Sequence, residues 1–454
     1  MKVVHVPFCF YPDPVGGTEI YVEALARSLQ PLGVESVIAA PSSGDEGPPR
    51  QSHSLKVRRF AVAPESGEML RELYGAGDPL AAARFGRVLD EERPDVVHMH
   101  AFTRGASLRV LREAKRRRLP VVFTYHTPTV SCQRGTLLRY GREVCDGALD
   151  RRVCARCTLQ GLGLNGTRGR MLSMLPPTVG RVLGAARLEG RVWTALRMSE
   201  LTQLRHEAFR ELMREADGVV ALCRWGTELL LRNGVPAEKI VLSWHGLAQA
   251  VTHPAPADGA SDFDRRPLRV AFLGRTDPTK GPDTLIRALR SRPRLDVQLD
   301  LYGIVQGATG HDYFDELKQL AAGDSRINFL PAAPADVVVA LLKDYHLLAV
   351  PSRGLETGPL VVLEAFAAGR PVLGSRLGGL AELIRDGQDG LLVEAGNVPA
   401  WVEAFERLAD DRGLLKRLQS EVNPPRRMSE VAAEMKTLYR RLIRAGNITQ
   451  SLAS

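Results

Sequence analysis

Apolar segments that alternate with amphipathic segments run along the chain in two successive series, and this alternation limits the fold more than any other feature. The first series has apolar runs at residues 3–7, 36–40, 93–100, 119–125, 217–223 and 240–244. The second has runs at residues 268–273, 297–302, 327–330, 347–351, 371–374 and 390–393. Continuous apolar runs between helical patterns are typical of parallel strands covered on both faces. Each half of the chain is therefore predicted to be a doubly wound, Rossmann-like α/β domain.

The segment between the two series indicates a domain boundary. Residues 251–267 are rich in Pro, Ala, Asp and Gly and lack an apolar period, so they are predicted to be a linker. The predicted domains are residues 1–250, with a cysteine-rich insert near 132–157, and residues 268–423. Residues 424–454 are predicted to be helical, and whether this helix crosses back to the first domain is left open. Because ligands bind at the carboxyl ends of such strands, the two domains are expected to face each other across a cleft.

The net charge narrows the choice of partner. The 454 residues carry a formal charge of +9, which favours a diphosphate substrate or an anionic membrane face. No zinc-finger, helix-turn-helix or RNA-recognition signature accompanies this charge, so nucleic acid is not predicted as a partner. Met1–Val6 lead into Pro7 and not into a signal-peptide pattern, and no apolar run of about 18 residues is present. The protein is therefore predicted to be cytoplasmic, with peripheral contact at the inner face of the membrane left open.

The segment from Pro351 to Pro371 carries the strongest chemical signal. A predicted strand ends at Pro351, the following loop carries Glu356, and a helix is predicted to begin near Pro359, because proline suits the first helical position. Glu364 lies within that helix. Carboxylates accept hydrogen bonds from vicinal hydroxyls, so one glutamate is suited to a sugar and the other to a ribose. Two solvated glutamates are the alternative, but the loop, the helix start and the apolar flanks all favour a binding site.

The start of the same predicted helix is suited to an anion. The backbone N–H groups of Leu360 and Val361 lack intrahelical acceptors and lie at the positive end of the helix dipole. Such a helix start binds phosphate groups. Gly358, Leu360 and Val361 are therefore predicted to contact the phosphates of a donor.

A basic loop forms the second signal. The sequence Gly274–Gly281 follows a predicted strand, precedes a predicted helix, and contains Arg275 and Lys280. Arginine binds phosphate through two parallel hydrogen bonds, and lysine supplies a compact charge. The two cations are therefore predicted to clamp a leaving diphosphate. A basic surface turn is the alternative, and the glutamate motif in the same half of the chain favours the clamp.

Two weaker signals lie in the first half. Gly16 and Gly17 follow the first predicted strand, and paired glycines let backbone N–H groups approach a ligand closely. A tight connection is the alternative, and the absence of a GxGxxG pattern argues against ordinary NAD binding. His126 follows the predicted strand 119–125 and is expected to meet a sugar hydroxyl there, with a structural histidine as the equal alternative. His98 and His100, which end another strand, are interpreted as structural residues.

Four cysteines cluster after the strand that precedes His126. Cys132, Cys145, Cys154 and Cys157 lie in a segment interpreted as a loop-like insert. The last two form a Cys-x-x-Cys pair, whose spacing suits zinc thiolates. The insert has little apolar content to hold it together, which favours structural zinc over four reduced thiols.

The segment Arg168–Arg197 is basic and amphipathic. It contains six arginines and one acidic residue, Glu189, between apolar residues that include Trp193. Such a segment can lie on an anionic membrane face. A solvated helical face packed on the first domain is the alternative.

Together these residues resemble the family-4 retaining glycosyltransferases of the GT-B fold, and the resemblance covers most of the chain. The matching motifs are the amino-terminal glycine turn, Asp95-Val-Val-His98, the Arg275/Lys280 loop, Glu356 with Glu364, Gly369-Arg-Pro371-Val and Gly378-Gly379-Leu-Ala-Glu382. Two positions depart from the family pattern. Gly358-Pro359-Leu360 stands where Phe-Gly-Leu is usual, and Thr127 stands where an aspartate often follows the histidine of the cleft.

The resemblance implies a role for each residue. Arg275 and Lys280 would hold the diphosphate, and Glu364 would bind the ribose of the nucleotide. Glu356 would contact the transferred sugar, assisted by backbone groups at the helix start, and His126 would lie near that sugar. The resemblance also implies that catalysis requires no bound metal and no cofactor beyond the nucleotide-sugar donor.

The resulting hypothesis is a retaining glycosyltransferase that uses a UDP- or GDP-linked sugar and an acceptor hydroxyl. The acceptor is predicted to be a sugar or a lipid-linked intermediate of the cell envelope or an exopolysaccharide. A nucleotide-sugar 2-epimerase or hydrolase of the same fold, which would consume the donor without an acceptor, is the alternative enzyme. A catalytically silent sugar-nucleotide-binding scaffold is the alternative from another class.

Overall fold

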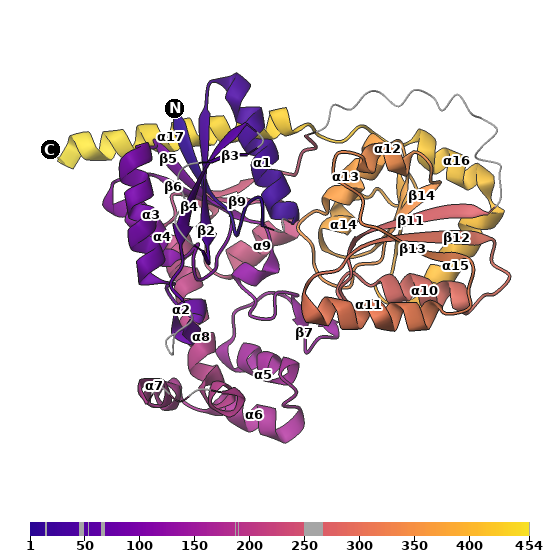
Figure 1. The fold of residues 1–454 in the computed structure, drawn as a ribbon, viewed down its shortest axis with the longest axis horizontal. Helices are drawn as coiled ribbons and strands as arrows, with labels where there is room; N and C mark the ends of the chain where they lie inside the picture. The colour runs from indigo at the N-terminus through magenta and orange to yellow at the C-terminus, as the bar shows by residue number, and fades with distance from the viewer. Residues whose placement is uncertain are drawn as a thin grey trace. The chain divides into compact units, whose positions relative to one another are not determined.

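The computed structural model describes residues 1–454 except 14–15, 45–49, 53, 65–68, 187, 189, 249–266 and 454. The side chains of residues 307–309 and 449–453 are likewise not described. The chain divides into two compact units, which are Met1–Trp244 with Met428–Ser454, and His245–Arg427. The predicted linker, residues 251–267, lies outside the described residues except for Pro267. Each unit contains one large sheet with helices on both of its faces (Figure 1).

The amino-terminal unit is built on an eight-stranded sheet with the order β10-β9-β6-β5-β1-β2-β4-β3. Neighbouring strands pair in parallel, except that β3 runs antiparallel to β4. The strands are β1 Lys2–Val6, β2 Glu35–Ser42, β3 Arg50–Ser52, β4 Leu55–Ala61, β5 Val96–Met99, β6 Val121–Tyr125, β9 Gly218–Ala221 and β10 Ile240–Leu242. The strand order reverses between β1 and β5, which is where ligands of doubly wound sheets bind.

Helices pack on both faces of this sheet. They are α1 Gly17–Leu29, η1 Gln30–Leu32, α2 Met69–Tyr74, α3 Pro79–Glu92, α4 Leu108–Arg116, η2 Pro128–Val130, α9 Arg224–Arg232, η3 Ala237–Lys239 and α17 Met428–Ala453. Helix α17 belongs to this unit although it is the last element of the chain, and it lies beside α1 (Figure 1). Its residues Val431, Met435, Leu438 and Tyr439 recur at helical spacing and are buried in the core of the unit.

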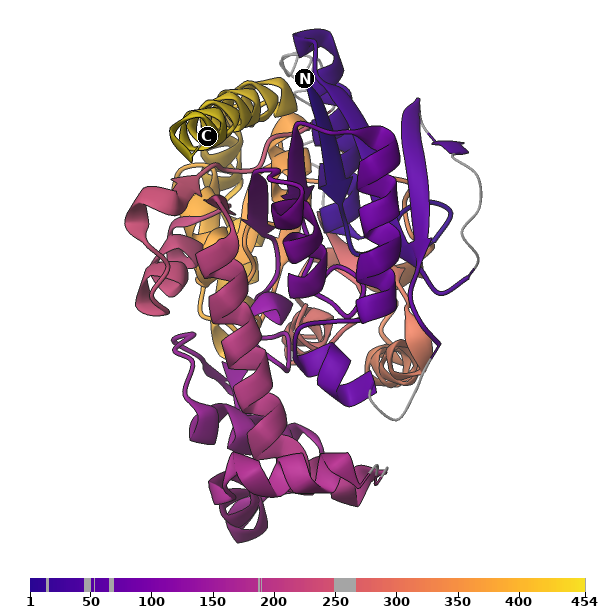
Figure 2. The ribbon, with the colours of Figure 1, turned by 90° about the vertical axis from the view of Figure 1, so that its left-hand side faces the viewer.

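An insertion follows β6 in the same unit. It contains β7 Leu138–Arg139, β8 Glu143–Val144, α5 Arg151–Gly161, α6 Gly166–Met174, α7 Pro177–Ala185 and the long helix α8 Arg191–Glu215. Figure 2 shows the shorter helices gathered at one end of α8, away from the sheet. Their own core is small and centres on Ala155, Leu159, Ala195 and Met198. The segment 132–157, which the sequence suggested to be loop-like, thus carries two short strands and the start of α5, and the basic segment Arg168–Arg197 is largely helical.

The carboxy-terminal unit has a six-stranded, fully parallel sheet with the order β13-β12-β11-β14-β15-β16. Its strands are β11 Leu268–Arg275, β12 Val297–Ile304, β13 Ile327–Leu330, β14 Leu347–Val350, β15 Val372–Ser375 and β16 Gly390–Val393. Its helices are α10 Pro282–Arg290, α11 Gly307–Ala321, α12 Val338–Leu342, α13 Leu360–Ala367, α14 Gly378–Leu383, α15 Val398–Asp410 and α16 Arg412–Ser420. The strand order reverses between β11 and β14. Trp401 and Phe405 are fully buried in the core on one face.

The two Rossmann-like sheets confirm the fold class predicted from the alternating apolar runs. One detail of the segment from Pro351 to Pro371 differs from the prediction, because Pro359 is the cap that precedes α13 and not its first helical residue. No helix in the described part of the chain combines the length and the apolar content that a bilayer crossing requires.

Candidate functional site

The basic loop follows β11 at the point where the strand order reverses. Gly281 adopts a left-handed conformation with φ +68°, and a Cβ atom there would lie 2.3 Å from the carbonyl oxygen of Pro351. Glycine is therefore required at this position, because the loop after β11 runs directly against the end of β14. The amide of Arg353 donates to the carbonyl oxygen of Thr279 at 2.7 Å, which ties the two loops together. This close packing places Lys280 beside the loop that carries Glu356.

Lys280 and Glu356 form an ion pair in the protein without ligand. Lys280 Nζ lies 2.5 Å from Glu356 Oε2, and the two side chains are 23% and 17% exposed. The hydroxyl of Ser352 donates to the other carboxylate oxygen of Glu356. Ser352 was not singled out from the sequence, although a polar side chain directly after a buried strand is the signal that marks it. The structure thus brings together two residues that are 76 positions apart in sequence.

Glycines also fix the loop that carries Glu356. The amide of Gly379, at the start of α14, donates to the carbonyl oxygen of Glu356 at 2.8 Å. A Cβ atom on Gly379 would lie 2.7 Å from that oxygen and 2.8 Å from the nitrogen of Gly358. Gly358 itself has φ +144°, which favours glycine. The backbone of the loop is therefore held by contacts that leave no room for a side chain.

The start of α13 presents unpaired backbone donors. The first turn closes through the amide of Val362, which donates to the carbonyl oxygen of Pro359. Within the described residues, the amides of Leu360 and Val361 have no such partner. Pro359 has no N–H of its own, so these two amides are the donors that the helix start offers to an anion.

Glu364 lies one turn further along α13 and is half-buried. Burial raises the pKa of its carboxyl group from 4.5 to about 7. Its side chain has no hydrogen bond or ion pair to a described residue, in contrast to Glu356. A half-buried carboxylate without a partner is suited to accept hydrogen bonds from a ligand. Arg275, which ends β11, is exposed and likewise has no ion pair within the described residues.

Three buried histidines form a hydrogen-bonded chain at the carboxyl edge of the amino-terminal sheet. His5 Nδ1 lies 3.1 Å from His100 Nε2, and His100 Nδ1 lies 3.0 Å from His126 Nε2. The three residues come from β1, the end of β5 and the end of β6, which are neighbours in the sheet. His5 was not predicted as part of this group, because strands that are distant in sequence bring it there.

His98 completes the group. Its two ring nitrogens are 2.6 Å from the hydroxyl of Tyr439 and 2.6 Å from Oγ1 of Thr124. Ring nitrogens of His5, His98 and His100 lie within 4.8 Å of one another, as in a potential metal site. A metal ion there would have to displace the hydrogen bonds that His98 and His100 already make.

Acid is expected to destabilise the amino-terminal unit through these histidines. Burial lowers the pKa of His5 to about 3 and the pKa values of His98 and His100 to well below 6.5. The unfolded chain therefore binds protons first as the pH falls below 6.5. Each histidine should remove up to about 1.4 kcal/mol from the free energy of unfolding per pH unit.

Chemical denaturation between pH 7 and pH 5 measures this loss. His5→Gln should reduce the dependence of the free energy of unfolding on pH by about one proton. An unfolding free energy that is independent of pH over this range would contradict the buried, neutral state of the group.

One backbone amide of the glycine turn before α1 already has a hydrogen-bond acceptor within the protein. The amide of Gly16 donates to the carboxylate of the buried Glu19 at 2.9 Å. Burial raises the pKa of Glu19, and backbone donors at Phe8 and Cys9 oppose that rise. Of the two predicted amides, Gly16 is therefore used internally. A Cβ atom on Gly17 would meet open space, so no close approach requires glycine there.

The four cysteines of the insertion lie near one another, since Cys132, Cys145 and Cys157 all act electrostatically on the thiol of Cys154. Cys154 and Cys157 lie one turn apart on α5, and Cys157 Sγ accepts a hydrogen bond from the amide of Tyr140 at 3.1 Å. In the part of the chain that is described, the side chains gathered within 4.8 Å are the three histidines and not Cys132, Cys145, Cys154 and Cys157. Burial raises the pKa of Cys154 to about 12, and the three other cysteines add to this rise. The zinc site therefore stays a prediction, with four reduced thiols as its alternative.

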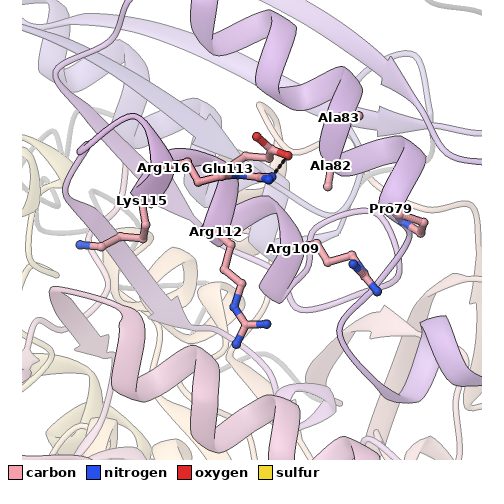
Figure 3. A pocket seen from close by; sticks show the side chains of 8 residues that line it. All are labelled: Pro79, Ala82, Ala83, Arg109, Arg112, Glu113, Lys115 and Arg116. Atoms are coloured by element: carbon pink, nitrogen blue, oxygen red, sulfur yellow. Dashed lines mark hydrogen bonds and ion pairs between the residues drawn. The ribbon is translucent and has the colours of Figure 1, made fainter.

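A separate pocket of about 700 Å³ lies between α3 and α4 (Figure 3). It is lined largely by basic side chains, but acidic residues neutralise most of them. Arg112 Nη2 lies 2.6 Å from Glu211 and 2.7 Å from Glu215, and Lys115 Nζ lies 2.8 Å from Asp217. We therefore do not assign the functional site to this pocket.

Two family models match this chain. Residues 16–243 match the glycosyl transferase 4-like domain, and residues 258–423 match the glycosyl transferases group 1. The protein therefore belongs to the family-4 glycosyltransferases of the GT-B fold, the family that its sequence motifs resemble.

Curated relatives match part of the chain. A D-inositol 3-phosphate glycosyltransferase of Salinispora arenicola is 39% identical over 222 residues, which are 45% of this chain and 49% of the relative. The enzyme of the same name from Rhodococcus jostii is 32% identical over 224 residues, which are 47% of this chain and 49% of the relative. The chain thus matches about half the length of these relatives.

Solved structures match along the whole chain. A sucrose-phosphate synthase from Thermosynechococcus elongatus superposes with a TM-score of 0.67 at 20% identity, over 98% of this chain and 99% of that one. HepE of Anabaena, in complex with UDP-glucose, superposes with a TM-score of 0.59 at 18% identity, over 99% of this chain and 100% of that one. These similarities support the fold.

Proposed function

We propose that this protein is a retaining glycosyltransferase that moves a sugar from a nucleotide-diphosphate donor to an acceptor hydroxyl. The observation that carries the proposal is the group of side chains where the strand order of the carboxy-terminal sheet reverses. There Lys280 is paired with Glu356 at 2.5 Å. Helix α13 follows with two amides and the Glu364 carboxylate, none of which has a partner among the residues that the structure describes. A cation, anion-binding amides and a free carboxylate supply what a diphosphate and a ribose require.

Each residue has a role in this proposal. Arg275, Lys280 and the amides at the start of α13 bind the diphosphate, and Glu364 binds the ribose. Glu356 contacts the transferred sugar. On the amino-terminal unit, His126, whose Nε2 lies 3.0 Å from His100 Nδ1, binds a hydroxyl of the transferred sugar.

The reaction breaks the bond between the anomeric carbon and the diphosphate oxygen, and forms a bond from that carbon to the acceptor oxygen. The acceptor attacks from the face that the diphosphate leaves, which keeps the anomeric configuration. The acceptor proton passes to the departing phosphate. Arg275 and Lys280 stabilise the charge that develops on this leaving group, which is electrostatic catalysis.

The comparisons favour particular donors and acceptors for this proposal. The UDP-glucose complex of HepE favours a UDP-linked donor, and GDP-linked sugars are the next candidates. D-inositol 3-phosphate is the acceptor in the names of the curated relatives, so a small phosphorylated polyol joins the sugar or lipid-linked envelope intermediate as a candidate acceptor.

A donor screen tests the function. UDP- and GDP-sugars are incubated with the purified protein, and nucleotide release is measured with and without an acceptor extract. We expect one donor to raise the melting temperature and to be consumed only when acceptor is present. Release without acceptor would assign the protein to the epimerases or hydrolases. A folded protein that responds to no donor would be assigned to the silent scaffolds.

Donor binding should tighten as the pH rises through 7. A ribose hydroxyl donates to the ionised form of Glu364, whose pKa in the free protein is about 7. Protonation of Glu364 should therefore raise the Kd of a UDP-sugar at pH 6 by roughly tenfold relative to pH 8. Calorimetry with UDP-glucose measures this, since a substituted diphosphate does not titrate in that range.

Glu364→Gln is the control for this pH dependence. The amide cannot ionise, so the variant should bind the donor weakly, with a Kd that is nearly constant from pH 6 to pH 8. The same pH dependence in wild type and variant would remove Glu364 from the ribose site. The pH dependence of stability has the opposite sign. Folding raises the pKa of the Glu364 carboxyl group, so its contribution should lower the free energy of unfolding as the pH rises from 4.5 to 7.

A further inference from the structure

Exposed apolar side chains are concentrated in the insertion. Of the 16 large apolar residues that are exposed in the described part of the chain, eight lie between Val144 and Val192. Four of these are especially open, with exposures of 71% for Met171, 55% for Met174, 69% for Val182 and 69% for Val192. Scattered single exposures need no explanation, but a local concentration marks an interaction surface.

The packing of the short helices explains why these side chains point outward. Helix α7 packs on α8 through Gly180 and Gly184, where a Cβ atom would lie 2.5 Å from Glu200 and 2.7 Å from Arg197 respectively. Because the small residues occupy the inner side, Val182 is left on the outer side.

Helix α6 is arranged in the same way. Gly169 and Ser173 are buried, and Leu172 packs against the small core of the insertion. Met171 and Met174 lie on the opposite side at helical spacing. The insertion therefore has one apolar side packed inward and a second one left uncovered.

The exposed charges of the described residues on the same surface have one sign. Between residues 151 and 199 the sequence contains a single acidic residue, Glu189. Arg168, Arg170, Arg181 and Arg191 are all exposed, and within the described residues none of their guanidinium groups has an ion-pair or hydrogen-bond partner. The basic residues of the pocket between α3 and α4 differ in this respect, because acidic residues neutralise most of them.

We propose that this surface, formed by α6, α7 and the start of α8, docks on an anionic lipid bilayer. Unpaired guanidinium groups bind lipid phosphates, and methionine and valine side chains between them enter the boundary with the acyl chains. Nucleic acid would supply phosphates for the arginines, but it would not bury the apolar side chains of Met171, Val182 and Val192. A solvated helical face, in turn, mixes acidic with basic residues, whereas the exposed charged residues described on this surface are all basic.

Vesicle co-sedimentation at low salt tests the proposal with the full chain. We expect binding to vesicles of phosphatidylcholine with phosphatidylglycerol, and little binding to phosphatidylcholine alone. The triple variant Arg168→Gln, Arg170→Gln, Arg181→Gln should lower the partition coefficient by about a hundredfold. No binding of the wild type to the anionic vesicles would overturn the proposal.

A matched charge control separates this surface from net charge. The variant Arg440→Gln, Arg441→Gln, Arg444→Gln removes the same three charges from exposed positions of α17. It should bind the anionic vesicles nearly as the wild type does. An equal loss of binding in both triple variants would show non-specific attraction and would also overturn the proposal.

The apolar contribution has its own test. Serine at Met171, Met174 and Val182 should weaken vesicle binding by at least tenfold. Serine at three exposed residues elsewhere, Leu231, Val337 and Ile448, should not.

Circular dichroism melts verify that each variant folds. Sedimentation velocity tests whether the surface instead binds a second copy of the chain. The proposal is wrong if the wild type self-associates, if the Met171/Met174/Val182 variant does not, and if neither protein binds vesicles.

Discussion

Lys280→Ala should lower the turnover number by about two to three orders of magnitude, which is the usual effect of removing one group that stabilises charge in a transition state. Lys280 lies on the loop after β11 and is held 2.5 Å from Glu356 by packing of the two loops. Its charge is therefore already positioned before the donor binds. Without it, Glu356 keeps its negative charge and has lost the cation that pairs with it, so the diphosphate meets a repulsive site.

Single-turnover kinetics and calorimetry with the identified donor measure this effect. A transition-state role predicts that the turnover number falls more than the donor affinity does. Lys318→Ala is the matched control, because that lysine is exposed in the same unit and contacts only its own helix, at Asp315 and at the ring of Phe314, among the described residues. Unchanged turnover by a folded Lys280→Ala protein would refute the role of Lys280 in leaving-group stabilisation.

The Glu356→Gln exchange in the Lys280→Ala background probes the repulsion. Removing the carboxylate charge of residue 356 should restore donor affinity in part but not turnover, because no cation is returned to the leaving group. Equal recovery of both quantities would show that Lys280 acts only by neutralising Glu356.

The fold could be predicted from sequence because parallel strands covered on both faces are continuously apolar, as in Val121–Tyr125 and Leu347–Val350. The strand Leu55–Ala61 was missed because its sequence, LKVRRFA, carries three cations. Two of them, Lys56 and Arg58, pair with the buried Glu92, and only the tertiary structure supplies that partner.

The candidate site was predictable to the extent that its residues lie within one loop or helix. The Arg275/Lys280 loop and the Glu356–Glu364 segment were found by their positions after strands, but their pairing was not, since it depends on β11 and β14 being neighbours. The histidine chain depends in the same way on three neighbouring strands. The zinc hypothesis rested on the Cys-x-x-Cys spacing and on the low apolar content of the insert, and the structure adds that Cys154 and Cys157 lie one turn apart on α5.

Gly379→Ala should lower turnover by about a hundredfold although the new side chain adds one methyl group and touches no proposed ligand. The added Cβ would lie 2.7 Å from the carbonyl oxygen of Glu356 and 2.9 Å from the carbonyl carbon of Thr357, and both are backbone atoms that cannot rotate away. The loop that carries Glu356 must therefore move. Displacements of this size cost about a hundredfold when they misplace a group in an active site.

The same substitution should lower the free energy of unfolding by about 1–3 kcal/mol, as overpacking of a close-packed region does. Gly310→Ala is the control in the same unit, because the nearest atom to its new Cβ lies at an ordinary 3.7 Å. That variant should keep its activity and gain slightly in stability, since alanine is the better helix former.

Denaturant unfolding and steady-state kinetics of the two variants separate misplacement from unfolding. A Gly379→Ala protein that is folded at the assay temperature and inactive would place Glu356 in the reaction through the position of its loop. A protein with the predicted loss of stability but full turnover would mean that the position of this loop does not matter to catalysis, and Glu356 would have to be removed from the proposed site.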